Sequence, residues 1–231
     1  MDSELINIKK NVLDLNLELK NSKLIIQNFG NASIKYKDKF YIKPSGVDLS
    51  SVTYKDMVEV NIDKDNVFKD LKPSVDTPTH KILYKTFPEI KSIIHTHSTY
   101  ATAYAQAEKE IRNLGTTQAD FSYGSIPITR PLSESEVNED YEKNTGKTIV
   151  EEIERRDLNC LNIPGILSIR HGVFAWGQDA IQCLKNAEII EHLAKLNYIT
   201  ESINPTVTEL NSHTLDKHFL RKNGSESYYG Q

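Results

Sequence analysis

The clearest pattern in the chain is a helical spacing of apolar residues near the N-terminus. Apolar side chains recur every three or four positions from Leu5 to Leu19. Residues at this spacing share one face of an α-helix, so the pattern predicts an amphipathic helix that opens the chain. A second stripe predicts the longest helix, over residues 178–198, with Ala180, Leu184, Ala187, Ile190 and Ala194 along one face.

Shorter apolar runs lie between these two helices. Residues 24–62 contain β-type runs broken by the turn-forming pairs Gly30-Asn31 and Ser45-Gly46. A helix is predicted from Thr77, as a possible N-cap with Pro78 at the first helical position, to Phe87. Further helices are predicted over 101–110, 144–156 and the start of the tail 206–231, with strands over 91–97, 166–169 and 173–176. Because no regular βαβ rhythm appears, we expect a mixed or antiparallel sheet covered by helices.

Composition is that of an ordinary globular protein and excludes several function classes. The 231 residues are 38% hydrophobic and 26% charged, and the net charge of -4 argues against nucleic acid or an anionic membrane as partner. Cys160 and Cys183 form no CxxC pair, so we expect neither a disulfide framework nor a thiolate metal site. The N-terminus lacks a signal-peptide core, and no apolar run is long enough to span a bilayer. We therefore expect a cytoplasmic, single-domain protein over residues 1–231.

The sharpest local signal for chemistry is His95-Thr96-His97 in a predicted strand. Side chains at positions i and i+2 of a strand point to the same face, about 6–7 Å apart. Two imidazoles at this spacing can converge on one metal ion, and zinc binds imidazole readily. The competing interpretation is two polar residues at a strand end.

Three further residues compete to complete a metal site. His171 stands before Gly172 at a predicted strand exit, and Asp76 precedes the helix that starts at Thr77. His80, four residues after Asp76, is an alternative ligand on the same helix face. Asp76 could equally serve as a carboxylate favoured by the helix dipole. His192 lies inside a long predicted helix and is expected to be a surface or core residue, and spacing alone leaves the ligand set open.

Short motifs in order over nearly the whole chain resemble the class II aldolase and L-ribulose-5-phosphate 4-epimerase family, and its epimerase branch in particular. The matching motifs are GNAS (30–33), KPSG (43–46), DTPTH (76–80), HTHS (95–98), GTTQAD (115–120), IPITR (126–130), HGVFAWG (171–177) and YYGQ (228–231). The resemblance implies an α/β fold, with a central, mostly antiparallel sheet covered by helices on both faces. It also implies an enzyme that acts on a small sugar phosphate.

The resemblance assigns the binding residues. It implies a zinc ion held by His95, His97 and His171 with Asp76 as the acidic ligand, and manganese or cobalt can substitute in such a site. It implies that the substrate phosphate is bound by Gly30, Asn31, Ser45, Gly46, Ser74 and position 75. The backbone N–H groups of small turn residues suit an anion, although two ordinary hairpin turns would give the same sequence pattern. This chain has Val75 where the epimerases carry serine, which removes one hydroxyl contact.

The resemblance also assigns the proton-transfer groups and an assembly. Asp120 and Tyr229 are implied as the catalytic acid and base, with Lys43, Thr116, Glu142 and His218 in supporting positions. The family forms a homotetramer with active sites at subunit interfaces, so the tail 206–231 would complete an active site. Gln118 replaces a family histidine close to Asp120, where it could alter the hydrogen bonds of that carboxylate.

Three functions remain open from the sequence. The expected activity is interconversion of L-ribulose 5-phosphate and D-xylulose 5-phosphate by cleavage and re-formation of the C3–C4 bond. An aldolase on another sugar phosphate would use the same metal chemistry, but Asp76 and the terminal pair Tyr228-Tyr229 argue against it. A non-catalytic, adducin-like binding domain would be expected to lose the histidines, and all three are present here.

Overall fold

The centre of the molecule is one six-stranded sheet in the order β3-β2-β1-β4-β6-β5, and every pair of neighbouring strands is antiparallel. The computed structural model describes residues 3–64, 66, 68, 71–224 and 227–228. The strands are β1 (Gly30–Tyr36), β2 (Lys39–Ile42), β3 (Val58–Asn61), β4 (Ser92–Thr96), β5 (Gly165–Ser168) and β6 (Gly172–Gly177). Lys37 and Arg170 adopt positive φ angles, of 59° and 55°, in the tight turns that join β1 to β2 and β5 to β6.

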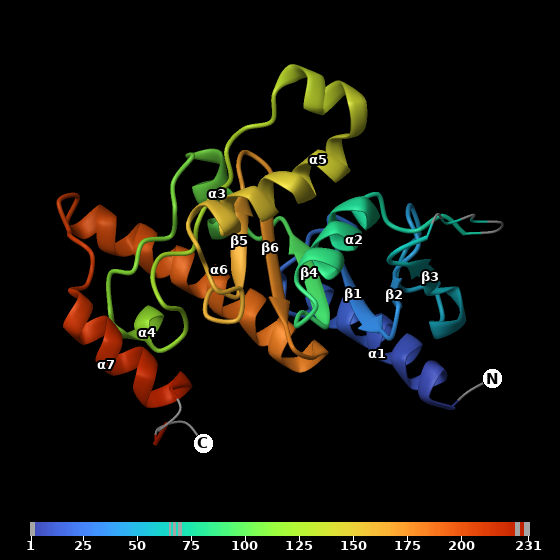
Figure 1. The fold of residues 1–231 in the computed structure, drawn as a ribbon, viewed down its shortest axis with the longest axis horizontal. Coiled ribbons are helices and arrows are strands. Elements are labelled where there is room, and N and C mark those ends of the chain that lie inside the picture. The colour runs from blue at the N-terminus through green and yellow to red at the C-terminus, as the bar shows by residue number, and fades with distance from the viewer. Residues whose placement is uncertain (1–2, 65, 67, 69–70, 225–226, 229–231) are drawn as a thin grey trace.

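Helices cover both faces of this sheet, as expected (Figure 1). They are α1 (Ser3–Asn21), α2 (Thr77–Thr86), α3 (Thr99–Gln106), α4 (Thr116–Ala119), α5 (Glu134–Arg155), α6 (Ala180–Ile203) and α7 (Ser212–Asn223), with a 3₁₀ turn at Tyr54–Asp56. One core packs α1, α3 and α6 on the sheet, and a second packs α2 and α5 on the opposite face. Alternate residues of β6 feed the two cores: Val173 belongs to the first, and Phe174 and Trp176 to the second.

Several expected helix boundaries differ from the structure. The helix expected over 101–110 is α3 at Thr99–Gln106, and the helix expected at the start of the tail 206–231 begins only at Ser212, as α7. Two other differences have a local cause. The helix expected from residue 144 begins at Glu134 instead, but it is broken at Asp140, where φ is -160° and ψ is 86°. Residues 134–143 are almost entirely polar, so no apolar stripe marks their helical part. In α2 the N-cap is Asp76 rather than Thr77, because the backbone N–H of His80 already donates to the Asp76 carbonyl.

The small helix α4 and the C-terminal helix α7 pack together at one end of the molecule, while α1 and β1 to β3 lie at the other (Figure 1). The loop 111–126 that carries α4 is closed by backbone hydrogen bonds between Ile111 and Ile126. Among the described residues, no helix combines the length and apolarity needed to cross a membrane.

Candidate metal and phosphate site

Three histidines converge at one end of the central strands β4 and β6. In the sheet register, His95 of β4 stands opposite Asn31 of β1 on one side and Phe174 of β6 on the other. His97 follows the last residue of β4, and His171 directly precedes β6. One ligand atom from each histidine lies within 4.8 Å of the other two. The antiparallel pairing of β4 with β6 therefore brings together residues that are more than seventy positions apart.

Hydrogen bonding orients the innermost imidazole toward the other two. Nδ1 of His95 donates to the Val173 carbonyl at 3.0 Å, which leaves the lone pair of Nε2 facing the site. Nε2 of His95 lies 3.0 Å from Nε2 of His97. Burial lowers the pKa of His95 to about 3, with the neighbouring His97 adding to the effect. Burial also lowers the pKa of His171 to about 4 and lowers that of His97, so all three rings are neutral at pH 7.

This donor set fits a zinc ion. Zinc binds neutral imidazole at about 2.0–2.1 Å, and tetrahedral geometry places two such nitrogens about 3.4 Å apart. The 3.0 Å separation of the two Nε2 atoms is close to that value. Nδ1 of His171 is buried and has no hydrogen-bond partner among the described residues. Neutral imidazole nitrogens that converge in this way can all turn a lone pair toward one divalent cation.

The three histidines line a cavity, and Asp76 lines it as well. Asp76 is not part of the three-histidine group. It is 8% exposed, and its Oδ2 accepts a hydrogen bond of 2.6 Å from Nδ2 of Asn31. The carboxylate does not cap α2, because no side-chain capping bond is formed there. The Asp76 carboxylate therefore lines the cavity without capping the helix.

The alternative ligand His80 lies outside the group, as does His192. His80 is fully buried, and its Nδ1 is 2.7 Å from the hydroxyl of Ser33, which is in turn 2.8 Å from the hydroxyl of Tyr84. Burial lowers its pKa to about 3, against the opposing effect of Asp76. His192 is exposed on α6. Of the described residues, only His95, His97 and His171 form a potential metal group.

The residues implied for phosphate binding line the same cavity, whose volume is about 260 Å³. They are Gly30, Asn31, Ser45, Gly46, Ser74 and Val75, and they are joined there by Lys43 and Glu142. Lys43 is 4% exposed, and burial lowers its pKa while Asp76 opposes the shift. The cavity thus combines a potential metal group with a cation and small turn residues.

One of the two expected turns has a different structure. Ser45-Gly46 does form a turn, with φ of 68° at Gly46, but Gly30-Asn31 begins strand β1. A Cβ at Gly30 would lie 2.5 Å from Ile25 Cγ2 and 2.7 Å from the His95 carbonyl, so glycine is required for close packing. Asn31 is placed in the cavity by strand register rather than by a turn.

A second polar cluster lies between α4 and α7. The Asp120 carboxylate accepts from Nδ1 of His218 at 3.1 Å and from Nη2 of Arg221 at 3.0 Å. Burial opposes ionisation, but these hydrogen bonds outweigh it and lower the pKa of Asp120. Neither these residues nor Thr116 line the histidine cavity. Tyr229 lies outside the described residues.

The local role of Gln118 is structural. It is 2% exposed, and its Nε2 donates to the carbonyls of Ile111 at 2.9 Å and Gly124 at 3.3 Å. These bonds hold the loop around α4, and the carboxylate of Asp120 is instead bound by His218 and Arg221.

Two aromatic residues of the cavity wall were missed by sequence reasoning. The Phe29 ring stacks on His97 with a centroid distance of 6.2 Å, and the Tyr141 ring lies 5.8 Å from that of His171. Phe29 precedes the GNAS motif and could have been noticed there, whereas Tyr141 sits in a polar segment without any local signal.

Comparison with known proteins gives a consistent result. The family described as "Class II Aldolase and Adducin N-terminal domain" matches residues 10–198. The chain is 43% identical over 226 residues, 97% of its length and 98% of theirs, to proteins named L-ribulose-5-phosphate 4-epimerase UlaF from Salmonella paratyphi C (strain RKS4594) and Salmonella choleraesuis (strain SC-B67). The fold superposes on a solved L-fuculose 1-phosphate aldolase with a TM-score of 0.76 at 21% identity, covering 92% of this chain and 94% of that one. The chain therefore belongs to the class II aldolase and adducin N-terminal domain family.

Proposed function

We propose that this protein is a zinc-dependent L-ribulose-5-phosphate 4-epimerase, which interconverts L-ribulose 5-phosphate and D-xylulose 5-phosphate. The observation that carries the proposal is that one cavity is lined by the three histidines, by Lys43 and by the residues that the resemblance implies for phosphate binding. It is supported by relatives of that name at 43% identity over 97% of the chain.

The reaction requires more than a simple proton transfer. The C4–H bond is not adjacent to the C2 carbonyl, so its proton is not acidic enough to be removed directly. Cleavage of C3–C4 with loss of the C4 hydroxyl proton gives glycolaldehyde phosphate and an enolised three-carbon fragment. Rotation of the aldehyde and re-addition to its other face, with proton return to the oxygen, inverts C4. Two proton-transfer groups are needed, one for each face.

The cavity provides the binding functions. A zinc ion held by His95, His97 and His171, with Asp76 as the acidic fourth ligand, would act as a Lewis acid on the substrate oxygens. The backbone N–H groups of Ser45 and Ser74 donate to the carbonyls of Lys72 and Lys43. Lys43, the two serine hydroxyls and the backbone N–H groups of Gly46 and Val75 would therefore hold the phosphate, which keeps the aldehyde fragment in place while it turns. Val75 lines the cavity and is 63% exposed. Like the serine found at this position in the family, it offers a backbone N–H group, but it has no hydroxyl.

The proton-transfer groups would come from a second copy of the chain. Asp120 and His218 do not line the histidine cavity, and we propose that they, with Thr116 and with Tyr229 from the tail, act at the site of a neighbouring subunit. The Arg221 and His218 hydrogen bonds lower the pKa of Asp120 and so keep it ionised, which is the form that can accept the C4 hydroxyl proton. Tyr229 would serve the opposite face of the aldehyde, and Glu142 would support the cavity side.

A homotetramer is consistent with the surface of α6. Leu196, Ile199 and Ile203 are 39%, 42% and 79% exposed, and their spacing of three and four residues places them on one side of the helix. Exposed apolar stripes of this kind are typical of protein–protein contacts.

Product analysis tests the proposal against the alternatives. Purified, zinc-loaded protein is incubated with L-ribulose 5-phosphate, and both D-xylulose 5-phosphate and free glycolaldehyde phosphate are measured. Epimerisation without free fragment supports the proposal. Steady release of the fragment would instead favour an aldolase, the activity named for the solved structure of the same fold. Absence of turnover with this and related sugar phosphates would favour a non-catalytic, adducin-like domain.

A further inference from the structure

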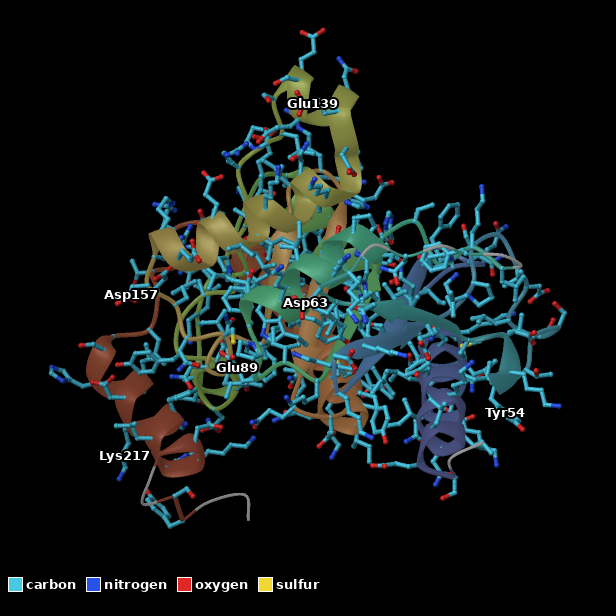
Figure 2. All side chains as sticks on the ribbon, turned by 45° about the vertical axis from the view of Figure 1, so that its right-hand side comes forward. Tyr54, Asp63, Glu89, Glu139, Asp157 and Lys217 are labelled. Atoms are coloured by element: carbon cyan, nitrogen blue, oxygen red, sulfur yellow. The ribbon has the colours of Figure 1, made fainter. Side chains whose placement is uncertain are left out.

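Helix α5 has two parts, and the break between them lies beside the metal cavity. Residues 134–140, here called the arm, form a helical turn that ends at the non-helical Asp140. The arm projects from the body of the molecule, and Glu139 marks its outer end (Figures 1 and 2). The chain returns from the arm directly into Tyr141 and Glu142, both of which line the cavity. Any contact that fixes the arm therefore also fixes this part of the cavity wall.

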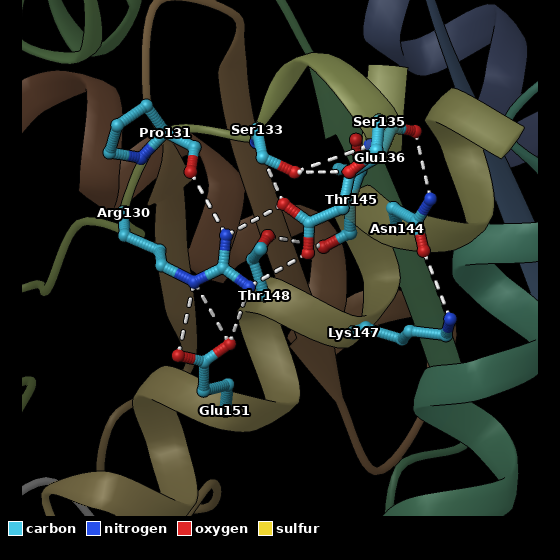
Figure 3. Close-up of polar contacts among 10 residues, drawn as sticks. All are labelled: Arg130, Pro131, Ser133, Ser135, Glu136, Asn144, Thr145, Lys147, Thr148 and Glu151. Carbon is cyan, nitrogen blue, oxygen red and sulfur yellow. Dashed lines mark hydrogen bonds and ion pairs between the residues drawn. The ribbon is translucent and has the colours of Figure 1, made fainter. Parts of the chain in front are cut away.

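Arg130, the last residue of the IPITR motif, joins the arm to the rest of α5 (Figure 3). Its Nη1 and Nη2 donate to the two carboxylate oxygens of Glu136 in the arm, at 2.9 and 2.8 Å. Its Nε and Nη2 donate to Glu151, in the second part of the helix, at distances between 2.9 and 3.1 Å. A planar guanidinium can bind two carboxylates in this forked manner, which a lysine cannot reproduce.

The backbone of the arm is held at the same residue. The Glu136 carbonyl accepts a hydrogen bond of 2.8 Å from Nδ2 of the buried Asn144, and the Glu136 carboxylate also accepts from the Ser133 backbone N–H at 2.8 Å. Glu136 is thus fixed through its carbonyl and its carboxylate, only five residues before Tyr141. On the cavity side, the Thr79 hydroxyl donates to the Glu142 carbonyl, which joins this wall to α2.

We propose that Arg130 is a positioning residue: through Glu136 it holds the arm, and thereby keeps Tyr141 against His171 and Glu142 at the cavity wall. The inference rests on the proposed function only in its kinetic part. Arg130 forms two ion pairs, but its side chain is 42% exposed and those of Glu136 and Glu151 are 23% and 49% exposed. Exposed pairs of this kind each contribute little, so loss of Arg130 should lower global stability only modestly. A misplacement of about 1 Å in a catalytic site can nevertheless lower the rate about 100-fold. The expected effect is therefore local and functional.

The test compares Arg130→Ala and Arg130→Lys with Arg155→Ala as the matched control. Arg155 lies in the same helix and binds Glu152 in a forked manner, with Nε and Nη2 contacts of 3.0 and 2.8 Å, but it does not contact the arm. Hydrogen exchange of residues 134–142 and steady-state kinetics are measured on zinc-loaded protein. For Arg130→Ala we expect amide exchange in this segment to rise at least about tenfold and kcat to fall about 10- to 100-fold, with a smaller change in KM. Arg130→Lys should restore part of the amide protection and part of kcat, and Arg155→Ala should change neither the exchange nor kcat.

Two outcomes would overturn the proposal: unchanged exchange in residues 134–142 of Arg130→Ala, or raised exchange with unchanged kcat. If the wild-type protein turns over no sugar phosphate, the proposed function fails. Exchange at Tyr141 and Glu142, which needs no substrate, then decides whether Arg130 positions the cavity wall.

Discussion

The buried His80, which does not line the three-histidine cavity, should make folding stability depend on pH in a way that can be calculated. His80 is fully buried against Ser33, and burial lowers its pKa to about 3. In the unfolded chain a histidine titrates near 6.5. Because the folded-state pKa is the lower one, the unfolded state takes up the proton first. The stability that His80 contributes is therefore complete above about pH 6.5 and is lost as pH falls toward the folded-state pKa.

The size of this effect follows from proton linkage. At pH 5 protonation of one unfolded histidine stabilises the unfolded state by about 2.1 kcal/mol, and at pH 7 by about 0.2 kcal/mol. His80 stays neutral in the folded protein over this range, since its pKa is about 3. The free energy of unfolding should therefore fall by about 2 kcal/mol between pH 7 and pH 5 through His80 alone. The result depends little on the folded-state value as long as it lies below about 4.

Urea unfolding of chelator-treated protein at pH 7, 6 and 5 measures this contribution. His80→Gln should be less stable at pH 7, because the contact with the Ser33 hydroxyl is altered. Its stability should nevertheless fall by about 2 kcal/mol less than that of the wild type on going to pH 5. The matched control, His192→Gln on the exposed side of α6, should keep the wild-type pH dependence. Parallel pH curves for the wild type and His80→Gln would refute the reasoning.

Three further predictions concern the site itself. A Cβ at Gly172 would lie 2.5 Å from the Thr96 carbonyl oxygen and 3.2 Å from the rings of His95 and His97. Gly172→Ala should therefore lose about 1–3 kcal/mol of folding stability and weaken zinc binding at least about tenfold in a metal titration. An unchanged zinc affinity would contradict this. Lys43→Met removes a buried cation from the cavity and should raise KM about 10- to 100-fold with a smaller effect on kcat. An unchanged KM would show that Lys43 does not bind the phosphate. Co-expression of Asp120→Asn and His97→Ala chains should give mixed tetramers in which some sites combine an intact His97 from one chain with an intact Asp120 from its neighbour. With random mixing, up to about one quarter of wild-type activity should return. Mixed tetramers as inactive as either parent would exclude a site shared between subunits.

Long, periodic elements of the fold could be predicted from the sequence, because their spacing reflects burial directly. The stripe from Leu5 to Leu19 and the helix over 178–198 correspond to α1 and α6. The arm of α5 could not be predicted in this way, since its residues are polar and are held by contacts of Glu136 with Arg130 and Asn144. Gly30 was expected in a turn because glycine is common there, but here it permits close packing of β1.

The candidate site was predictable where residues are close in sequence or belong to a motif. His95 and His97 share a strand end, His171 was a candidate at a predicted strand exit, and the family resemblance selected it over His80. Contacts between distant segments left no such signal: Arg221 binds Asp120 across 101 positions, and Tyr141 meets His171 only because of the break in α5. Pairings of this kind are created by tertiary structure and cannot be inferred from local spacing.

Zinc titration of the metal-free protein tests the central claim most directly. Zinc is added in steps to chelator-treated protein, and conversion of L-ribulose 5-phosphate to D-xylulose 5-phosphate is measured at each step, with His97→Ala in parallel. We expect activity to rise linearly and to reach its plateau at about one zinc per chain, while His97→Ala stays inactive and does not retain the metal. Full conversion by the metal-free protein, or an equally active His97→Ala variant, would contradict a zinc-dependent reaction at the three histidines.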